Sequence, residues 1–168
     1  SPTLFEDVIK TVTSCNVQWP STKQMNARLC EVVGGGAFPS AAKLARVRPN
    51  TLRARCRVGY RDQRMIDLAR IFRDGEMEEA DLQVLDDDAL RATLITLPGI
   101  GPYAANNIMQ LLGRYGFIPF DSEALRHAKE AHGMTGSDAT IRRDFEAHYA
   151  RYGEHRFRSY WFELWTRY

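Results

Sequence analysis

The chain has 168 residues, of which 44% are hydrophobic and 26% are charged, as in an ordinary globular protein with one core. It has no apolar run near the ~20 residues of a membrane-spanning helix, and no charged segment precedes an apolar stretch at its start, so neither a membrane span nor a signal peptide is predicted. Its three cysteines are an odd number without CxxC spacing, which argues against disulfides and a zinc site and favours reduced intracellular thiols.

The net charge is only +2, but the charged residues are segregated along the sequence. Residues 43–64 contain seven arginines and one lysine against a single acid, whereas residues 74–88 contain eight acids and no base. Such segregation usually makes one face cationic, as binding to a polyanion requires. The alternative is that the arginine-rich helices are simply solvated and pair with the acidic stretch.

The apolar residues recur at helical spacing almost throughout the chain. Helices are expected at residues 4–12; at 21–33, capped by Ser21 and ended by three glycines; from Pro39 to Leu44; and at 51–56, 60–72, 86–94, 102–112, 121–132, 138–151 (capped by Ser137) and 154–168. On the last helix, Trp161 and Trp165 are expected in the core, and Tyr168 on the same face. No segment alternates as a strand would. The prediction is an all-α fold, one compact multi-helix domain of about ten short helices spanning 1–168.

The most informative motif is Leu97-Pro98-Gly99-Ile100-Gly101, in which one helix runs into a two-glycine turn and a second helix leaves behind Pro102. Glycine permits positive φ and close backbone approach, and proline suits the first helical position. Residues 86–113 therefore predict a helix-hairpin-helix whose amides hold a DNA phosphate without reading sequence. The alternative is an ordinary connection between two helices of a bundle.

Asp121 follows Gly101 by 20 residues and stands at an expected helix start, where most aspartates are only caps. One helix after the turn, followed by a loop, would bring this position back toward the hairpin, where a bound strand would lie. A carboxylate there could stabilise positive charge on a deoxyribose and orient an attacking water, as in glycoside cleavage. Glu123 is a second carboxylate, but its place in the first helical turn favours capping or pairing.

Residues 97–106, followed by Ile118-Pro119-Phe120-Asp121, resemble the helix-hairpin-helix-Gly/Pro-Asp (HhH-GPD) superfamily of DNA glycosylases, which includes endonuclease III and the alkylated-base and oxidised-guanine glycosylases. The likeness covers nearly the whole chain. Residues 5–15 resemble the helix before the DNA-penetrating loop, residues 58–61 the glycine-aromatic turn, and residues 160–168 the closing aromatic helix. The N-terminal sheet domain of the latter two groups has no counterpart here, so we expect either a minimal member or a piece of a longer protein.

By this resemblance, Asp121 is the catalytic aspartate, and the DNA phosphate clamp consists of Leu97, Gly99, Ile100, Gly101 and Tyr103. In several family members the hairpin also binds a monovalent cation through backbone carbonyls, so such a cation is the one cofactor to consider. Bifunctional members have a lysine where this chain has Tyr103, and without that amine no Schiff base with the sugar can form there. The resemblance implies a monofunctional glycosylase, without an iron–sulfur cluster because no cysteine follows Cys56.

The resemblance also suggests residues that contact DNA. Asn16 aligns with the residue that fills the space left by a flipped base, and Tyr60 with the wedge that stacks on the opposite strand. Arg61 belongs to the arginines expected to hold DNA. Asn16 could instead end a helix and Tyr60 could lie in the core. Gln18 and Trp19 are candidates for the base pocket, although a tryptophan beside a proline is more often a packing residue.

The four histidines, His127, His132, His148 and His155, show no ligand spacing, so we expect surface or capping roles for them and no metal site. The sequence thus predicts a monomeric enzyme, associated with DNA in the nucleoid or nucleus, that acts on double-stranded DNA containing a damaged or mismatched base. One alternative is a non-catalytic helix-hairpin-helix module that binds DNA structure. The other is a helical interaction domain in which the glycine turn is only a corner.

Overall fold

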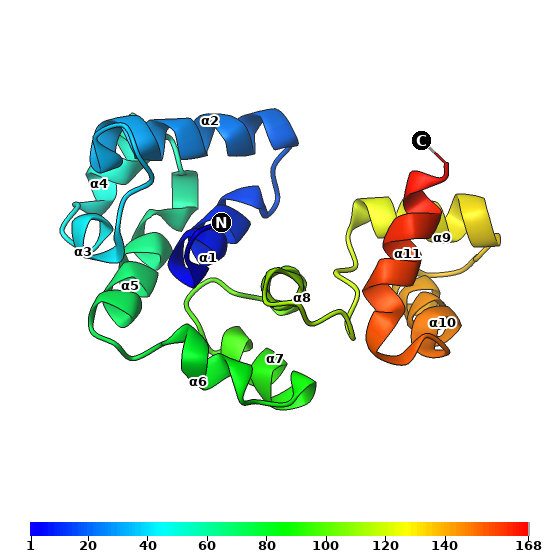
Figure 1. The fold of residues 1–168 in the computed structure, drawn as a ribbon. Coiled ribbons are helices and arrows are strands. Elements are labelled where there is room, and N and C mark those ends of the chain that lie inside the picture. Colours follow the sequence, from blue (N-terminus) through cyan, green and yellow to red (C-terminus); the bar gives the residue numbers. More distant parts are fainter. Residues whose placement is uncertain (168) are drawn as a thin grey trace. The chain divides into compact units, whose positions relative to one another are not determined.

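The computed structural model describes residues 1–167, and these residues form helices and connecting loops without any strand (Figure 1). The predicted all-α class is therefore confirmed. The described residues contain eleven α-helices, close to the number expected, with short 3-10 and π-helical turns between them. None of the described helices is long and apolar enough to cross a bilayer. The chain divides into two compact units, Ser1–Ala104 and Ala105–Tyr168.

The first unit contains α1 (Leu4–Ser14), α2 (Trp19–Leu29), α3 (Ala41–Leu44), α4 (Pro49–Thr51), α5 (Asp62–Arg73), α6 (Glu79–Gln83) and α7 (Asp87–Ile95), and α8 (Pro102–Leu111) begins within it. Single π-helical turns follow α2 and α4, at Cys30–Gly34 and Leu52–Cys56, and a 3-10 turn at Gly59–Arg61 leads into α5.

The core of the first unit forms where α1 packs against α2 and α5. The Thr3 hydroxyl caps α1 by accepting a hydrogen bond from the Glu6 amide. Val8 and Ile9 of α1 are fully buried, as are four apolar residues of α5 (Met65, Ile66, Leu68 and Ala69). Burying each larger aliphatic side chain contributes roughly 1.5–3 kcal/mol. This packing fixes the end of α1 and the start of α5, two places to which the sequence assigns DNA contacts.

The second unit contains α9 (Ser122–His132), α10 (Asp138–Ala150) and α11 (Arg156–Trp165), with a 3-10 turn at Gly153–His155 before the last helix. Its core consists of Ile118, Ala124, Ala128, Ile141, Phe145, Tyr149, Tyr160 and Leu164. Ser137 caps α10 as predicted, since its hydroxyl accepts a hydrogen bond from the Thr140 amide. Three helices therefore close around one aromatic-rich core.

Two predicted helix starts are wrong. Ser21 does not cap the second helix, because α2 already begins at Trp19 and carries Pro20 in its first turn, where a missing N–H removes no helical hydrogen bond. Pro39 does not open the third helix, since α3 begins at Ala41 behind the capping hydroxyl of Ser40. Both predicted starts lie two residues from the observed ones, because local capping interactions determine the first residue of a helix.

The predicted core positions of Trp161 and Trp165 are also wrong, because these side chains are 43% and 60% exposed. The buried face of α11 carries Tyr160 and Leu164 instead, one position before each tryptophan and so rotated by about 100°. Tyr168, expected on the tryptophan face, lies outside the described residues.

Candidate nucleic-acid interface

The hairpin predicted from the glycines is present between α7 and α8. Asp86 caps α7, its carboxylate accepting a hydrogen bond of 2.8 Å from the Ala89 amide, and α8 begins at Pro102 as expected. Between them, the side chains of Leu97 and Ile100 are buried, and the Ile100 amide donates to the Leu97 carbonyl at 3.1 Å. The buried side chains of Leu97 and Ile100 therefore hold the turn against the core, while the two glycines lie at the surface.

The two glycines of the turn meet different structural demands. Gly99 has a φ of +80°, and a Cβ there would lie 2.8 Å from Cδ of Arg64. Gly101 is outside the positive-φ region, and no neighbouring atom lies within 4 Å of where its Cβ would be. The positive φ and the close contact with Arg64 thus both require glycine at position 99. At Gly101, the lack of a side chain leaves the backbone accessible to an approaching molecule.

Asn16 and Tyr60 lie together although 44 positions separate them. Asn16 follows α1 with a φ of 54°, and its Nδ2 donates to the Tyr60 hydroxyl at 3.3 Å. Tyr60 is 52% exposed, so the expectation that it could be core is wrong. The Arg64 guanidinium lies over the Tyr60 ring, 5.3 Å from its centroid, and the Arg64 stem runs against Gly99. These four residues form one exposed row, which we call the Asn16–Gly99 row.

Arg61, predicted to hold DNA, has a different role in the structure. It is buried, and its guanidinium donates to the carbonyl oxygens of Val12 (3.1 Å), Val58 (3.2 Å) and Cys15. These carbonyls belong to the end of α1 and to the segment before α5. Arg61 therefore fixes the backbone that presents Asn16 and Tyr60, and we treat it as a positioning residue.

Other members of the arginine-rich stretch are at the surface. Six of its arginines are exposed, namely Arg46, Arg48, Arg53, Arg55, Arg57 and Arg64. Arg53 pairs with the buried Asp62 at 2.8 Å. Arg48 and Arg55 border an open hollow of about 550 Å³ that is completed by residues 49–51 and Ala54. The stretch thus supplies exposed positive charge in the same unit as the Asn16–Gly99 row, as attraction of a polyanion requires.

Gln18 and Trp19, the candidates for a base pocket, lie at the start of α2, where Gln18 is the N-cap residue and Trp19 the first helical residue. Trp19 is 66% exposed, so the alternative that it packs inside is wrong. Gln18 is exposed as well and precedes the first residue of α2. Asn16, Gln18 and Trp19 are thus exposed between the end of α1 and the first turn of α2, and a pocket role for Gln18 and Trp19 stays a prediction.

Asp121 lies in the second unit, at the start of α9. It is the N-cap residue, and its Oδ1 accepts hydrogen bonds from the amides of Glu123 (3.0 Å) and Ala124 (2.9 Å). Glu123 pairs with Arg126, as its place in the first turn predicted. The capping role that the sequence allowed for Asp121 is therefore real. Since the hairpin glycines belong to the first unit, the predicted approach of Asp121 to the hairpin stays a prediction.

Tyr103 is half-buried in the first turn of α8, at the position where the resemblance places the lysine of bifunctional enzymes. The monovalent cation expected at the hairpin stays a prediction, as does the expectation of no iron–sulfur cluster.

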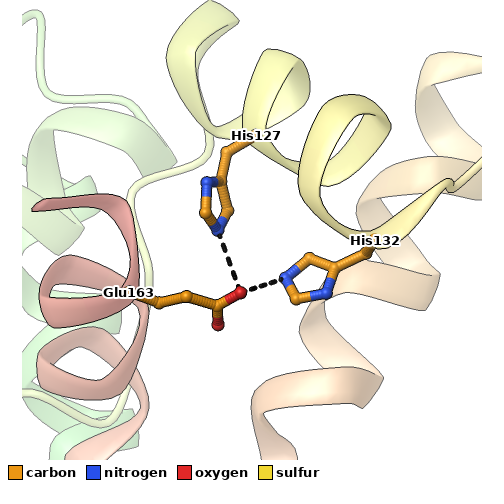
Figure 2. Close-up of side chains that lie close together, drawn as sticks. All are labelled: His127, His132 and Glu163. Atoms are coloured by element: carbon orange, nitrogen blue, oxygen red, sulfur yellow. Dashed lines mark ion pairs between the residues drawn. The ribbon is translucent and has the colours of Figure 1, made fainter. Parts of the chain in front are cut away.

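Sequence reasoning missed a cluster of polar side chains in the second unit. His127 is buried rather than at the surface, and Figure 2 shows its ring and that of His132 pointing toward Glu163. The imidazole Nε2 atoms of His127 and His132 lie 3.6 and 3.2 Å from the same carboxylate oxygen of Glu163. The one signal in the sequence is that His127 follows Ala124 by three positions, a spacing that places both on one face of a helix.

Comparison with known proteins gives a likeness in fold only. The sequence matches no family model and no curated protein. Among solved structures, the Clostridium acetobutylicum 8-oxoguanine glycosylase/lyase in complex with double-stranded DNA matches with a TM-score of 0.76 at 22% identity, over 88% of this chain and 54% of its own. The Bacillus halodurans DNA-3-methyladenine glycosidase matches with a TM-score of 0.74 at 19% identity, over 94% and 72%.

A third similar structure is the 3-methyladenine DNA glycosylase of Schizosaccharomyces pombe in complex with abasic DNA, with a TM-score of 0.71 at 18% identity, over 80% of this chain and 67% of its own. The chain spans just over half the length of the 8-oxoguanine glycosylase structures that it matches. It has the fold of the HhH-GPD DNA glycosylases, as the hairpin and the Asp121 motif predicted.

Proposed function

We propose that this chain, which has the HhH-GPD glycosylase fold, is a DNA glycosylase of base excision repair that removes a damaged or mismatched base from double-stranded DNA. The observation that carries the proposal is the hairpin itself: Leu97 and Ile100 anchor a turn whose two glycines are exposed at the start of α8. A helix N-terminus with exposed backbone suits a phosphate. The three solved structures described above are DNA glycosylases, and two of those three contain DNA.

In the proposed reaction the hairpin holds a phosphate of the DNA backbone. Asn16 and Tyr60 contact the duplex where one nucleotide turns out of the base stack. The N-glycosidic bond then breaks, and the electron pair leaves with the base, which takes up a proton. The carboxylate of Asp121 stabilises the positive charge left on the sugar, and water adds to C1′ to complete the hydrolysis. Because the two capping amides both bind Oδ1, they hold this carboxylate in one direction.

We propose further that the enzyme is monofunctional, leaving the DNA strand uncut. A lyase step needs a nucleophilic amine that forms a Schiff base with the sugar, and Tyr103 cannot supply one. The C. acetobutylicum neighbour is a glycosylase/lyase, so fold alone does not distinguish the two activities. Reduction with borohydride during turnover does: a monofunctional enzyme gives no covalent adduct with DNA, whereas an adduct would contradict this part of the proposal.

The central experiment compares Asp121→Asn with the unmodified chain on duplexes that each contain one alkylated, oxidised, deaminated or mismatched base. Asparagine caps helices about as well as aspartate, so the variant should fold. Base release should fall at least 100-fold on the best substrate, because removing one group that stabilises transition-state charge costs about 10²–10³. DNA affinity should change little. Glu123→Gln, which neutralises the neighbouring carboxylate, is the matched control and should release the base normally.

Unchanged release by Asp121→Asn would remove the catalytic assignment. If the unmodified chain binds every duplex but releases no base, the protein is instead a non-catalytic module that binds DNA structure. The capping role of Asp121 is the observation that keeps this second function in view.

A further inference from the structure

The polar cluster of the second unit joins three helices. His127 and His132 come from α9, Glu163 from α11 and Tyr149 from α10. The ligand atoms of His127, His132 and Glu163 all lie within 4.8 Å of one another (Figure 2). The Tyr149 hydroxyl donates to Oε2 of Glu163 at 2.8 Å, which leaves Oε1 as the oxygen that both imidazoles approach. Two nitrogens and one oxygen thus point toward a common centre.

The spacing of these atoms fits a tetrahedral metal ion. Bonds of about 2.0–2.1 Å at tetrahedral angles separate neighbouring ligand atoms by about 3.3 Å. The two distances to Oε1 of Glu163, 3.2 Å from His132 and 3.6 Å from His127, lie on either side of that value. The two Nε2 atoms lie at most 4.8 Å apart, so coordination requires them to approach each other by at most about 1.5 Å.

The charged side chains around the cluster bear on which ion it can bind. Arginines disfavour added positive charge here, since Arg126 and Arg167 face His127, and Arg151 and Arg167 face His132. A doubly charged ion must overcome them, which calls for the strong nitrogen ligands that the cluster provides.

We propose that His127, His132 and Glu163 bind one divalent transition-metal ion, zinc in preference, which links α9 to α11. Two imidazoles and one carboxylate are a ligand set typical of zinc, with a water in the fourth position. Tyr149 does not bind the ion but orients Glu163 through its hydrogen bond, as outer partners of metal ligands commonly do. The ion stabilises the second unit, a role independent of the glycosylase proposal.

A metal-free hydrogen-bond network is the competing explanation. The Tyr149 hydroxyl lies 3.1 Å from Nε2 of His132 and 3.4 Å from Nε2 of His127, so it can accept from both rings while donating to Glu163. That arrangement requires a proton on both Nε2 atoms, whereas a bound metal requires it on Nδ1. Zinc binding measured directly separates the two.

The test uses the full chain after treatment with a chelator, titrated with zinc by calorimetry and followed by thermal unfolding. One equivalent should bind, and at a zinc concentration 100 times Kd the Tm should rise by roughly 5–10 °C. Cobalt should replace zinc and give the visible absorption of a tetrahedral site. The absence of stoichiometric binding, or of any shift in Tm, would overturn the proposal.

Variants locate the site. His132→Gln and Glu163→Gln each remove one ligand at a partly exposed position and should weaken zinc binding at least 100-fold. His155→Gln is the matched control, because His155 is exposed and outside the cluster. Tyr149→Phe removes the hydroxyl of the competing network but no ligand, so zinc should still bind, at most about 100-fold more weakly. Zinc affinity unchanged in His132→Gln and Glu163→Gln would place the ion elsewhere and refute the assignment.

Discussion

Replacing Gly99 by alanine should destabilise the fold, whereas the same replacement at Gly101 should raise its stability slightly, by up to about 1 kcal/mol, because nothing crowds that position and alanine stiffens the unfolded chain. At Gly99, a Cβ in the left-handed region costs roughly 1–2 kcal/mol. The new carbon would also lie 2.8 Å from Cδ of Arg64, which must move away from the Tyr60 ring. Loss of that exposed cation–π contact costs about 0.5–1 kcal/mol. The stiffer unfolded chain returns about 0.4–1 kcal/mol, which leaves a net loss of roughly 1–2 kcal/mol.

Urea unfolding at constant m-value measures this difference, and a thermal melt should show Gly99→Ala lower by about 2–8 °C. DNA binding should give the opposite order. The methyl group of Gly101→Ala lies at the exposed corner where the hairpin is proposed to hold a phosphate, so the affinity for DNA should fall about 10-fold. The dependence of this affinity on salt concentration should correspond to one phosphate contact fewer. Gly99→Ala should weaken DNA binding only as far as it disturbs the turn.

Equal destabilisation by both alanines would refute the structural distinction between the glycines. Full DNA affinity in a folded Gly101→Ala variant would refute the phosphate site while leaving the fold intact. The two glycines thus serve as controls for each other, because they differ by two positions in one turn and receive the same methyl group.

Arg61→Met should cost about 3 kcal/mol or more in urea unfolding, because it removes three hydrogen bonds from a charged guanidinium to main-chain carbonyl oxygens. Exposed Arg46→Met is the control, and a cost below about 1 kcal/mol for Arg61→Met would contradict the positioning role. Tyr103→Lys should create a borohydride-trapped adduct with DNA that the unmodified chain lacks, and failure to trap any adduct in an active variant would argue that position 103 is remote from the sugar. Asn16→Gly should keep or slightly raise stability, since glycine tolerates the φ of 54°, yet lower base release; full activity would show that the Asn16 side chain does not support the flipped state.

The parts of the fold that sequence predicted well depend on local chemistry. The hairpin follows from two glycines and Pro102, and the caps at Ser137 and Asp121 follow from short polar side chains at helix starts. In each case, the residues that determine the structure lie within one helical turn of one another. Ser21 was misassigned for the same reason, because the proline beside it competed for the same helix start.

Burial within a run of similar residues could not be predicted in this way. Arg61 is one of seven arginines between residues 43 and 64, and its burial depends on carbonyls of α1 that are 46 and 49 positions away. On α11, aromatic residues occupy so many positions that helical spacing does not select a face, and the choice falls to packing against α9 and α10. The exposed Trp161 and Trp165 show the result.

The histidine cluster was invisible for a geometric reason. His127 and His132 are five positions apart, about 140° around a regular helix, so they do not look like a pair of ligands. Both rings meet at Glu163, which belongs to α11 and lies about thirty positions later in the chain. Spacing rules within one helix do not register a ligand that comes from another helix.

Capping and catalysis make compatible demands on Asp121. Electrostatic stabilisation of a transition state requires a charge whose direction is fixed before the reaction begins. A carboxylate bound by two main-chain amides meets that requirement, because backbone hydrogen bonds do not depend on flexible side chains. In the proposed mechanism, the cap of α9 is what orients the Asp121 carboxylate. For this reason, a conservative change to asparagine separates the two roles, since it keeps the cap and removes the charge.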